Sequence, residues 1–138
     1  MDKDTLERLR SAYREWNDSK AGSIDIWLNL VADEVDFRSI ADGMPGMEFS
    51  AARRSRAEVR DYLERLTRDW TMVHQTMDRF VADGDTIVAL GRCAWQNKQT
   101  GRTVQSPKAD VWTFNRGKAI AFFEFYDTAK AFGAAAPN

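Results

Sequence analysis

The second half of the chain alternates turn sequences with β-rich runs, and this pattern constrains the fold more than any other feature. Turn-forming residues recur at 82–85, 98–101 and 115–118, and each group contains a glycine. Short turns that separate runs of β-branched and aromatic residues are typical of antiparallel hairpins. The sequence therefore predicts four consecutive antiparallel strands at about 72–81, 86–97, 103–114 and 119–128.

The first half carries helical periodicity instead. Helices are predicted after Asp4 and Ser55, each followed three residues later by a glutamate in capping-box spacing, and a further helix is predicted after Ser23. We expect the Ser23 helix to end at residues 33–34, before a short strand at 35–39 and a long loop at 40–54. The residues expected on the inner helix faces are Leu6, Leu9, Tyr13, Trp16, Ile24, Trp27, Leu28, Val31, Val59, Tyr62, Leu63, Leu66 and Trp70.

Helices followed by strands indicate an α+β fold, in which three helices cover one side of a strongly curved antiparallel sheet and leave an internal pocket. The length of 138 residues is typical of one domain. We therefore expect a single domain over residues 1–138, with loose tails at about 1–3 and 130–138.

The composition excludes several classes of partner and cofactor. Twenty basic and 21 acidic residues leave a net charge of -1, so we expect neither nucleic-acid nor membrane binding. One histidine and one cysteine do not make a common zinc site, and no glycine-rich phosphate loop follows a strand; no metal or nucleotide cofactor is expected. The first ten residues contain no apolar secretory segment, so we expect a cytoplasmic protein.

Strand alternation indicates which residues face the pocket. On the third predicted strand Lys108, Asp110, Trp112 and Phe114 share a face, and the last strand carries a matching inward set of Ile120, Phe122, Glu124 and Tyr126. The short turn between these strands would place Asp110 opposite Glu124. Two apposed carboxyls in an aromatic pocket cannot both ionise cheaply, so the pair would supply a proton donor beside a base. Alternatively, either acid pairs with Lys108 or Arg92.

The order of elements and three local patterns resemble the nuclear transport factor two-like superfamily, in particular its SnoaL-like polyketide cyclase and ketosteroid isomerase branches. The patterns are residues 30–35, residues 80–88, and the segments 111–114, 117–118 and 124–127. The resemblance covers nearly the whole chain and implies a cone-shaped, curved sheet around a pocket. It does not specify one activity, because this fold hosts isomerases, cyclases, hydrolases, dehydratases and non-catalytic binding domains.

The resemblance also assigns positions. Asp110 falls where ketosteroid isomerases carry a protonated aspartic acid that binds an oxyanion, but Ser39 stands where their general-base aspartate would be. Glu124 resembles the acid that activates water in limonene epoxide hydrolases, yet Gly91 and Cys93 replace their inward Arg-x-Asp pair. Neither steroid isomerisation nor epoxide hydrolysis is therefore expected.

These observations leave several functions open. The first is an isomerase, cyclase or lyase without a cofactor, acting on an apolar carbonyl or polycyclic compound with Asp110 and Glu124 as catalytic residues. The others are a non-catalytic domain that binds a small apolar organic ligand, and a dimeric interaction module with a collapsed pocket. The predicted substrate-binding residues are Tyr13, Trp16, Trp27, His74, Trp112, Phe122 and Tyr126. For His74 the alternative is a hydrogen-bonded core residue.

A homodimer is also expected. Met77, Val81, Phe123 and Phe125 would give the outer face of the sheet a partly apolar character, and such a face is either exposed to water or buried between subunits.

Overall fold

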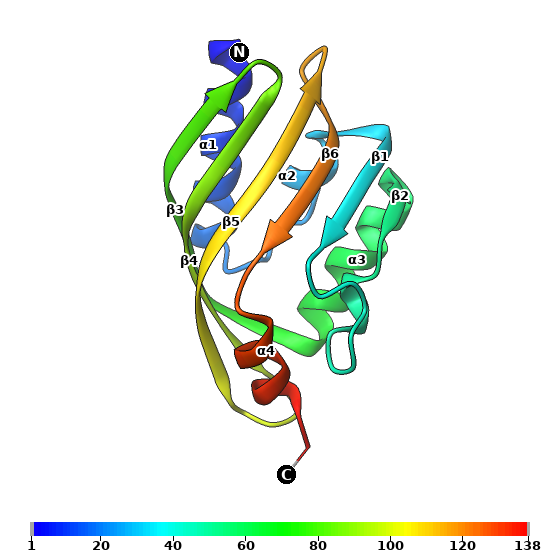
Figure 1. The fold of residues 1–138 in the computed structure, drawn as a ribbon, viewed down its shortest axis with the longest axis vertical. Helices are drawn as coiled ribbons and strands as arrows, with labels where there is room; N and C mark the ends of the chain where they lie inside the picture. Colours follow the sequence, from blue (N-terminus) through cyan, green and yellow to red (C-terminus); the bar gives the residue numbers. More distant parts are fainter. Residues whose placement is uncertain (1, 138) are drawn as a thin grey trace.

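A computed structural model describes residues 2–137 and shows a curved, unclosed sheet with helices packed against it (Figure 1). The helices are α1 (Lys3–Asp18), α2 (Asp25–Leu28), α3 (Arg56–Asp69) and α4 (Thr128–Ala135), with a 3-10 turn η1 (Glu48–Ser50). The strands are β1 (Val31–Ser39), β2 (Arg53–Ser55), β3 (Trp70–Asp83), β4 (Thr86–Asn97), β5 (Thr103–Asn115) and β6 (Lys118–Phe125). The α+β class is confirmed.

The predicted four-strand meander forms most of the sheet. The strand order is β2-β1-β6-β5-β4-β3, and β3 to β6 pair antiparallel with their sequence neighbours. β1 joins the meander by pairing parallel to β6, and β2 extends the other edge of β1. α1 packs on β3, whereas α3 packs on β1 and β3. No helix among residues 2–137 combines the length and apolar character needed to cross a bilayer.

Capping determines where α1 and α3 begin. Ser55 caps α3 as predicted, because its hydroxyl accepts the Glu58 N–H at 3.2 Å while a Glu58 carboxylate oxygen accepts the Arg54 N–H at 2.8 Å. The cap of α1 is Asp2 rather than the predicted Asp4; the Asp2 carboxylate accepts the Asp4 N–H at 3.0 Å.

The predicted second helix is too long. α2 has only four residues, and residues 31–34, expected at the end of a helix, lie in β1. The reason is tertiary: Val31 pairs with Ala119 of β6 and is fully buried there. An apolar residue such as Val31 suits the inner face of a helix and a buried strand equally well, and here it lies in the strand.

The C-terminal segment is a further correction. Residues 130–135 were expected in a loose tail, and the last strand was expected to reach residue 128, but Thr128–Ala135 form α4. The Asp127 carboxylate caps this helix by accepting the Lys130 N–H at 3.0 Å. Thr100 in the β4–β5 turn donates to the Ala134 carbonyl at 2.5 Å, so α4 is held against this hairpin (Figure 1).

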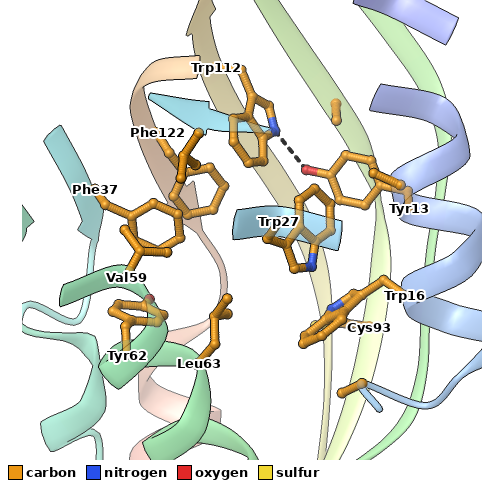
Figure 2. Packing of buried hydrophobic residues seen from close by; sticks show 14 of the residues in the cluster. Tyr13, Trp16, Trp27, Phe37, Val59, Tyr62, Leu63, Cys93, Trp112 and Phe122 are labelled. Atoms are coloured by element: carbon orange, nitrogen blue, oxygen red, sulfur yellow. Dashed lines mark hydrogen bonds between the residues drawn. The ribbon is translucent and has the colours of Figure 1, made fainter. Parts of the chain in front are cut away.

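Aromatic side chains connect the helices to the sheet. Trp27 stacks on Trp112 with ring centroids 5.5 Å apart, and Trp112 contacts Phe122 at 4.5 Å. Phe122 stacks in turn on Phe37 at 4.4 Å, and the Phe37 ring meets the Tyr62 ring of α3 edge-on. Figure 2 shows this cluster between α1, α3 and the inner face of the sheet.

Irregular pairing alters which side chains point inward. The register of β3 shifts between Met72 and His74, and Gln75 is consequently buried where strict alternation would place His74. The Asn17 side-chain oxygen accepts the Gln75 N–H at 2.9 Å and holds this irregularity against the end of α1. A shift between Thr113 and Phe114 similarly leaves Ile120 exposed, although it was predicted to face inward.

The outer face of the sheet carries a row of apolar side chains. Val81, Val88, Val111 and Phe123 are consecutive cross-strand partners on β3, β4, β5 and β6, and Val81 is exposed. Met77 was expected on this outer face, but it is partly buried and packs against the core.

Gly91 allows β3 and β4 to approach closely, which gives a test of this geometry. A Cβ at Gly91 would lie 1.9 Å from the Thr76 carbonyl oxygen. Because both strands would have to move, we expect Gly91→Ala to lower the free energy of unfolding by about 3 kcal/mol in urea denaturation.

Gly133→Ala is the matched control. Gly133 is exposed in α4, and no atom lies within 4 Å of its would-be Cβ. Because alanine has a higher helix propensity than glycine, the free energy of unfolding of this variant should rise by up to about 1 kcal/mol. Equal effects of the two substitutions would contradict the close approach at Gly91.

Candidate functional site

A cavity of about 90 Å³ lies between the helices and the inner face of the sheet. Six of the seven predicted substrate-binding residues line it: Tyr13, Trp16, Trp27, Trp112, Phe122 and Tyr126. His74 does not line the cavity, because the register shift in β3 turns Gln75 inward in its place. The cavity reaches Asp110 and Glu124, so the pocket is not collapsed.

The two acids face each other as predicted, but a third residue lies between them. Asp110 and Glu124 are direct cross-strand partners on β5 and β6. The Lys108 ammonium donates to Asp110 Oδ1 at 2.5 Å and to Glu124 Oε1 at 2.8 Å. The side chains of Lys108, Asp110 and Glu124 are only 6%, 2% and 12% exposed. The alternative in which the acids pair with Lys108 is thus confirmed, whereas Arg92 instead binds Asp78 at 2.9 Å.

Two tyrosines complete the polar cluster. The Tyr13 hydroxyl donates to Asp110 Oδ2 at 2.5 Å and accepts the Trp112 indole N–H at 2.8 Å. The Tyr62 hydroxyl donates to Glu124 Oε2. Each of the four carboxylate oxygens therefore accepts a hydrogen bond from the protein.

Tyr62 was predicted only as part of the apolar face of α3, so its contact with Glu124 is new. The one feature of the sequence that could have indicated this contact is that Tyr62 carries a hydroxyl on an otherwise apolar helix face. Sequence periodicity shows that Tyr62 points inward, but it does not show which acid the hydroxyl meets. Ser39, at the position where isomerases carry their general base, is buried and hydrogen-bonded to the Tyr126 hydroxyl at 3.1 Å.

Burial and charge determine the protonation states of these groups. Burial raises the pKa of Asp110, Lys108 opposes this effect, and the neighbouring Glu124 adds to it. Burial alone would lower the pKa of Lys108, but the two carboxylates outweigh it and raise that pKa above its ordinary value. Burial and the adjacent carboxylates raise the pKa values of Tyr13 and Tyr62. At neutral pH the cluster consequently presents an ammonium ion and two phenols that act as donors.

This protonation pattern defines the chemistry that the cluster offers. An ammonium group has three N–H donors, and residues 2–137 accept only two from Lys108. The third has no hydrogen-bond acceptor among residues 2–137, and the Nζ also lies 5.7 Å from the centroid of the Tyr126 ring. Cys93 also lines the cavity, but burial raises the pKa of its thiol to about 11, which does not suit a nucleophile. Among residues 2–137, no three His, Cys, Asp or Glu side chains gather as metal ligands.

Comparison with solved structures shows the same fold in several proteins. An NTF2-like protein of unknown function from Burkholderia pseudomallei has a TM-score of 0.82 at 20% identity, with 99% of this chain and 100% of that chain covered. TerC, crystallised with polyporic acid, has a TM-score of 0.76 at 17% identity, with 95% and 97% covered.

A third similar structure is a protein with a ketosteroid isomerase-like fold from Catenulispora acidiphila, in complex with trimethylamine. Its TM-score is 0.75 at 12% identity, with 94% of this chain and 92% of that chain covered. No curated protein matches the sequence. The model of the SnoaL-like domain family matches residues 9–122, which include most of α1, all of β1 to β5, and the polar cluster except Glu124. The chain therefore belongs to the SnoaL-like domain family and has the NTF2-like fold.

Proposed function

We propose that this protein is an enzyme that catalyses acid-base chemistry on a small apolar carbonyl compound without a cofactor. The observation that carries this proposal is the Lys108 ammonium, buried between two carboxylates in a cavity lined by aromatic rings. Strongly perturbed titratable groups at a cavity wall are characteristic of sites that move protons.

In the proposed reaction, the third N–H of Lys108 donates to the substrate carbonyl oxygen. Glu124 then removes a proton from the adjacent carbon, and the electron pair of the C–H bond moves toward that oxygen, forming an enolate. The ammonium stabilises the developing negative charge. In a substrate with a β,γ-double bond, protonated Glu124 returns the proton to the γ-carbon of the dienolate and completes an isomerisation. In a substrate with a β-hydroxyl group, it protonates that hydroxyl, which leaves as water in a dehydration.

Asp110 has a supporting role in this scheme because its side chain is 2% exposed against 12% for Glu124, and its oxygens accept hydrogen bonds from Lys108 and Tyr13. It fixes the position of the ammonium and keeps it charged. This differs from the sequence-based hypothesis, in which Asp110 itself donates the proton or binds the oxyanion.

The cavity volume restricts the substrate. A cavity of roughly 150 Å³ is sufficient for benzene, and the present cavity is about 90 Å³. A polycyclic compound would therefore require its walls to move apart, so we favour a substrate with one small ring or a short chain.

A non-catalytic binding protein is the second candidate. It is favoured by the complete engagement of the four carboxylate oxygens, since each of them already accepts a hydrogen bond from the protein. Two structural relatives were determined with small organic molecules, polyporic acid and trimethylamine, which supports ligand binding in either case.

Proton exchange tests the proposal without knowledge of the natural substrate. We expect the protein in deuterated buffer to accelerate exchange of the acidic C–H protons of cyclopentanone and cyclohexanone, measured by proton NMR. Glu124→Gln removes the base and should reduce the accelerated rate by a factor of about 10² or more.

The control is Glu64→Gln, the same change on the exposed surface of α3, which should leave the rate unaltered. Binding of the ketones without any exchange would support the non-catalytic alternative. Exchange that survives Glu124→Gln would refute the assignment of the base.

We also propose that the outer apolar row forms the interface of a homodimer. A two-fold interface buries the same patch on both subunits, and Val111 lies within this row. Val111→Lys should shift the protein from dimer to monomer in sedimentation velocity at micromolar concentration, whereas Ala57→Lys on the exposed side of α3 should not. A native protein that sediments as a monomer would rule the dimer out.

A further inference from the structure

The inner face of β3 carries a buried amide without a partner. Gln75 is 5% exposed and lines the cavity. Its backbone N–H donates to the Asn17 side-chain oxygen, and its carboxamide makes no hydrogen bond within residues 2–137, although the carboxamide atoms are not fully enclosed as the Trp70 indole N–H is. Buried polar side chains in folded proteins nearly always have a partner. An unpartnered carboxamide at a cavity wall therefore indicates a group that a ligand satisfies.

A second unpartnered group lies on the same strand. Trp70 is 3% exposed and lines the same cavity, and its buried indole N–H has no hydrogen-bond partner within residues 2–137. An indole N–H is only a donor. A ligand atom that meets the Trp70 N–H is consequently an acceptor, such as a hydroxyl or carbonyl oxygen, and an oxygen of the same kind suits the Gln75 amide.

The register places this part of the wall away from Lys108. Gln75 pairs with Cys93 on β4, and Cys93 pairs with Ser106 on β5, two residues before Lys108. Neighbouring strands lie about 4.8 Å apart, so the Gln75 and Ser106 backbones are separated by roughly 10 Å. The two polar groups thus come from strands two positions apart in the sheet, and both line the same cavity.

We propose that Gln75 is a specificity-determining contact, and that the ligand carries a second oxygen function across its apolar body from the carbonyl group that Lys108 binds. This inference rests on the proposed function, because it takes the cavity as the ligand site. It defines the substrate class as small apolar carbonyl compounds with a remote hydroxyl or carbonyl oxygen.

Two probes of matched shape test the inference. 4-Hydroxycyclohexanone has both oxygen functions, and 4-methylcyclohexanone replaces the hydroxyl with a methyl group. The native protein should bind the hydroxyl probe more tightly by a factor of about 5, the value of one neutral hydrogen bond, in ligand titrations followed by NMR.

Gln75→Met should abolish this preference while the methyl probe binds at least as tightly as before. Gln105→Met makes the same change on the exposed face of β5 and should retain the preference. If the preference for the hydroxyl probe persists in Gln75→Met, the inference about Gln75 is wrong, but the proposed function is not affected. Failure of both probes to bind the native protein would remove the proposed function, and the inference with it.

A measurement without ligand provides an independent test. Because the Gln75 carboxamide is buried without a partner, replacing it with an apolar side chain of similar length should raise the thermal unfolding midpoint, by about 3 °C. An unchanged or lower midpoint in both Gln75→Met and Gln75→Leu would show that the fold itself uses the amide, and would overturn the inference.

Discussion

The ion pairing of Lys108 with Asp110 and Glu124 is the interaction on which the rest of the site depends. Two carboxylates and one ammonium leave a net charge of -1 in a cavity whose walls are mostly aromatic. Removing either kind of charge would leave the other uncompensated in a medium of low polarity, where an unpaired ion is strongly unfavourable. Tyr13 and Tyr62 stabilise the carboxylates further, since each donates a hydrogen bond to one of them.

Strand geometry brings these charges together. Lys108 and Asp110 lie two residues apart on β5 and so share its inner face, and the short turn into β6 places Glu124 opposite Asp110. The helices supply the phenols from the other side, and stacked rings between Trp27 and Phe37 fix the distance between the two layers. The irregular register of β3 then adds Gln75 to the wall, so a local departure from regular pairing determines one of its polar groups.

Sequence periodicity predicted the meander, the α3 cap and the apposition of Asp110 and Glu124, because these depend on local turns and strict alternation. It did not predict the short α2, since Val31 suits a helix face and a strand equally and only β6 decides between them. The alanine-rich α4 lacks an apolar stripe and is stabilised by contacts with the β4–β5 hairpin. His74 was misplaced because a β-bulge leaves no clear mark in the sequence. The Tyr62 contact depends on the relative placement of α3 and β6, which no local pattern encodes.

The most direct measurement of the central claim is the stability of Lys108→Met as a function of pH, with the exposed Lys130→Met as the control. Without the ammonium, the folded-state pKa of the buried Asp110 carboxyl rises further. The folded variant then favours the protonated carboxyl, which is present at low pH and is lost as the pH rises, so the variant loses stability as the pH rises. The account predicts that the free energy of unfolding of Lys108→Met is lower than that of the native protein by about 3 kcal/mol at pH 7, and that this difference largely disappears near pH 4. A loss of equal size at both pH values would show that Lys108 acts through packing and would contradict the account.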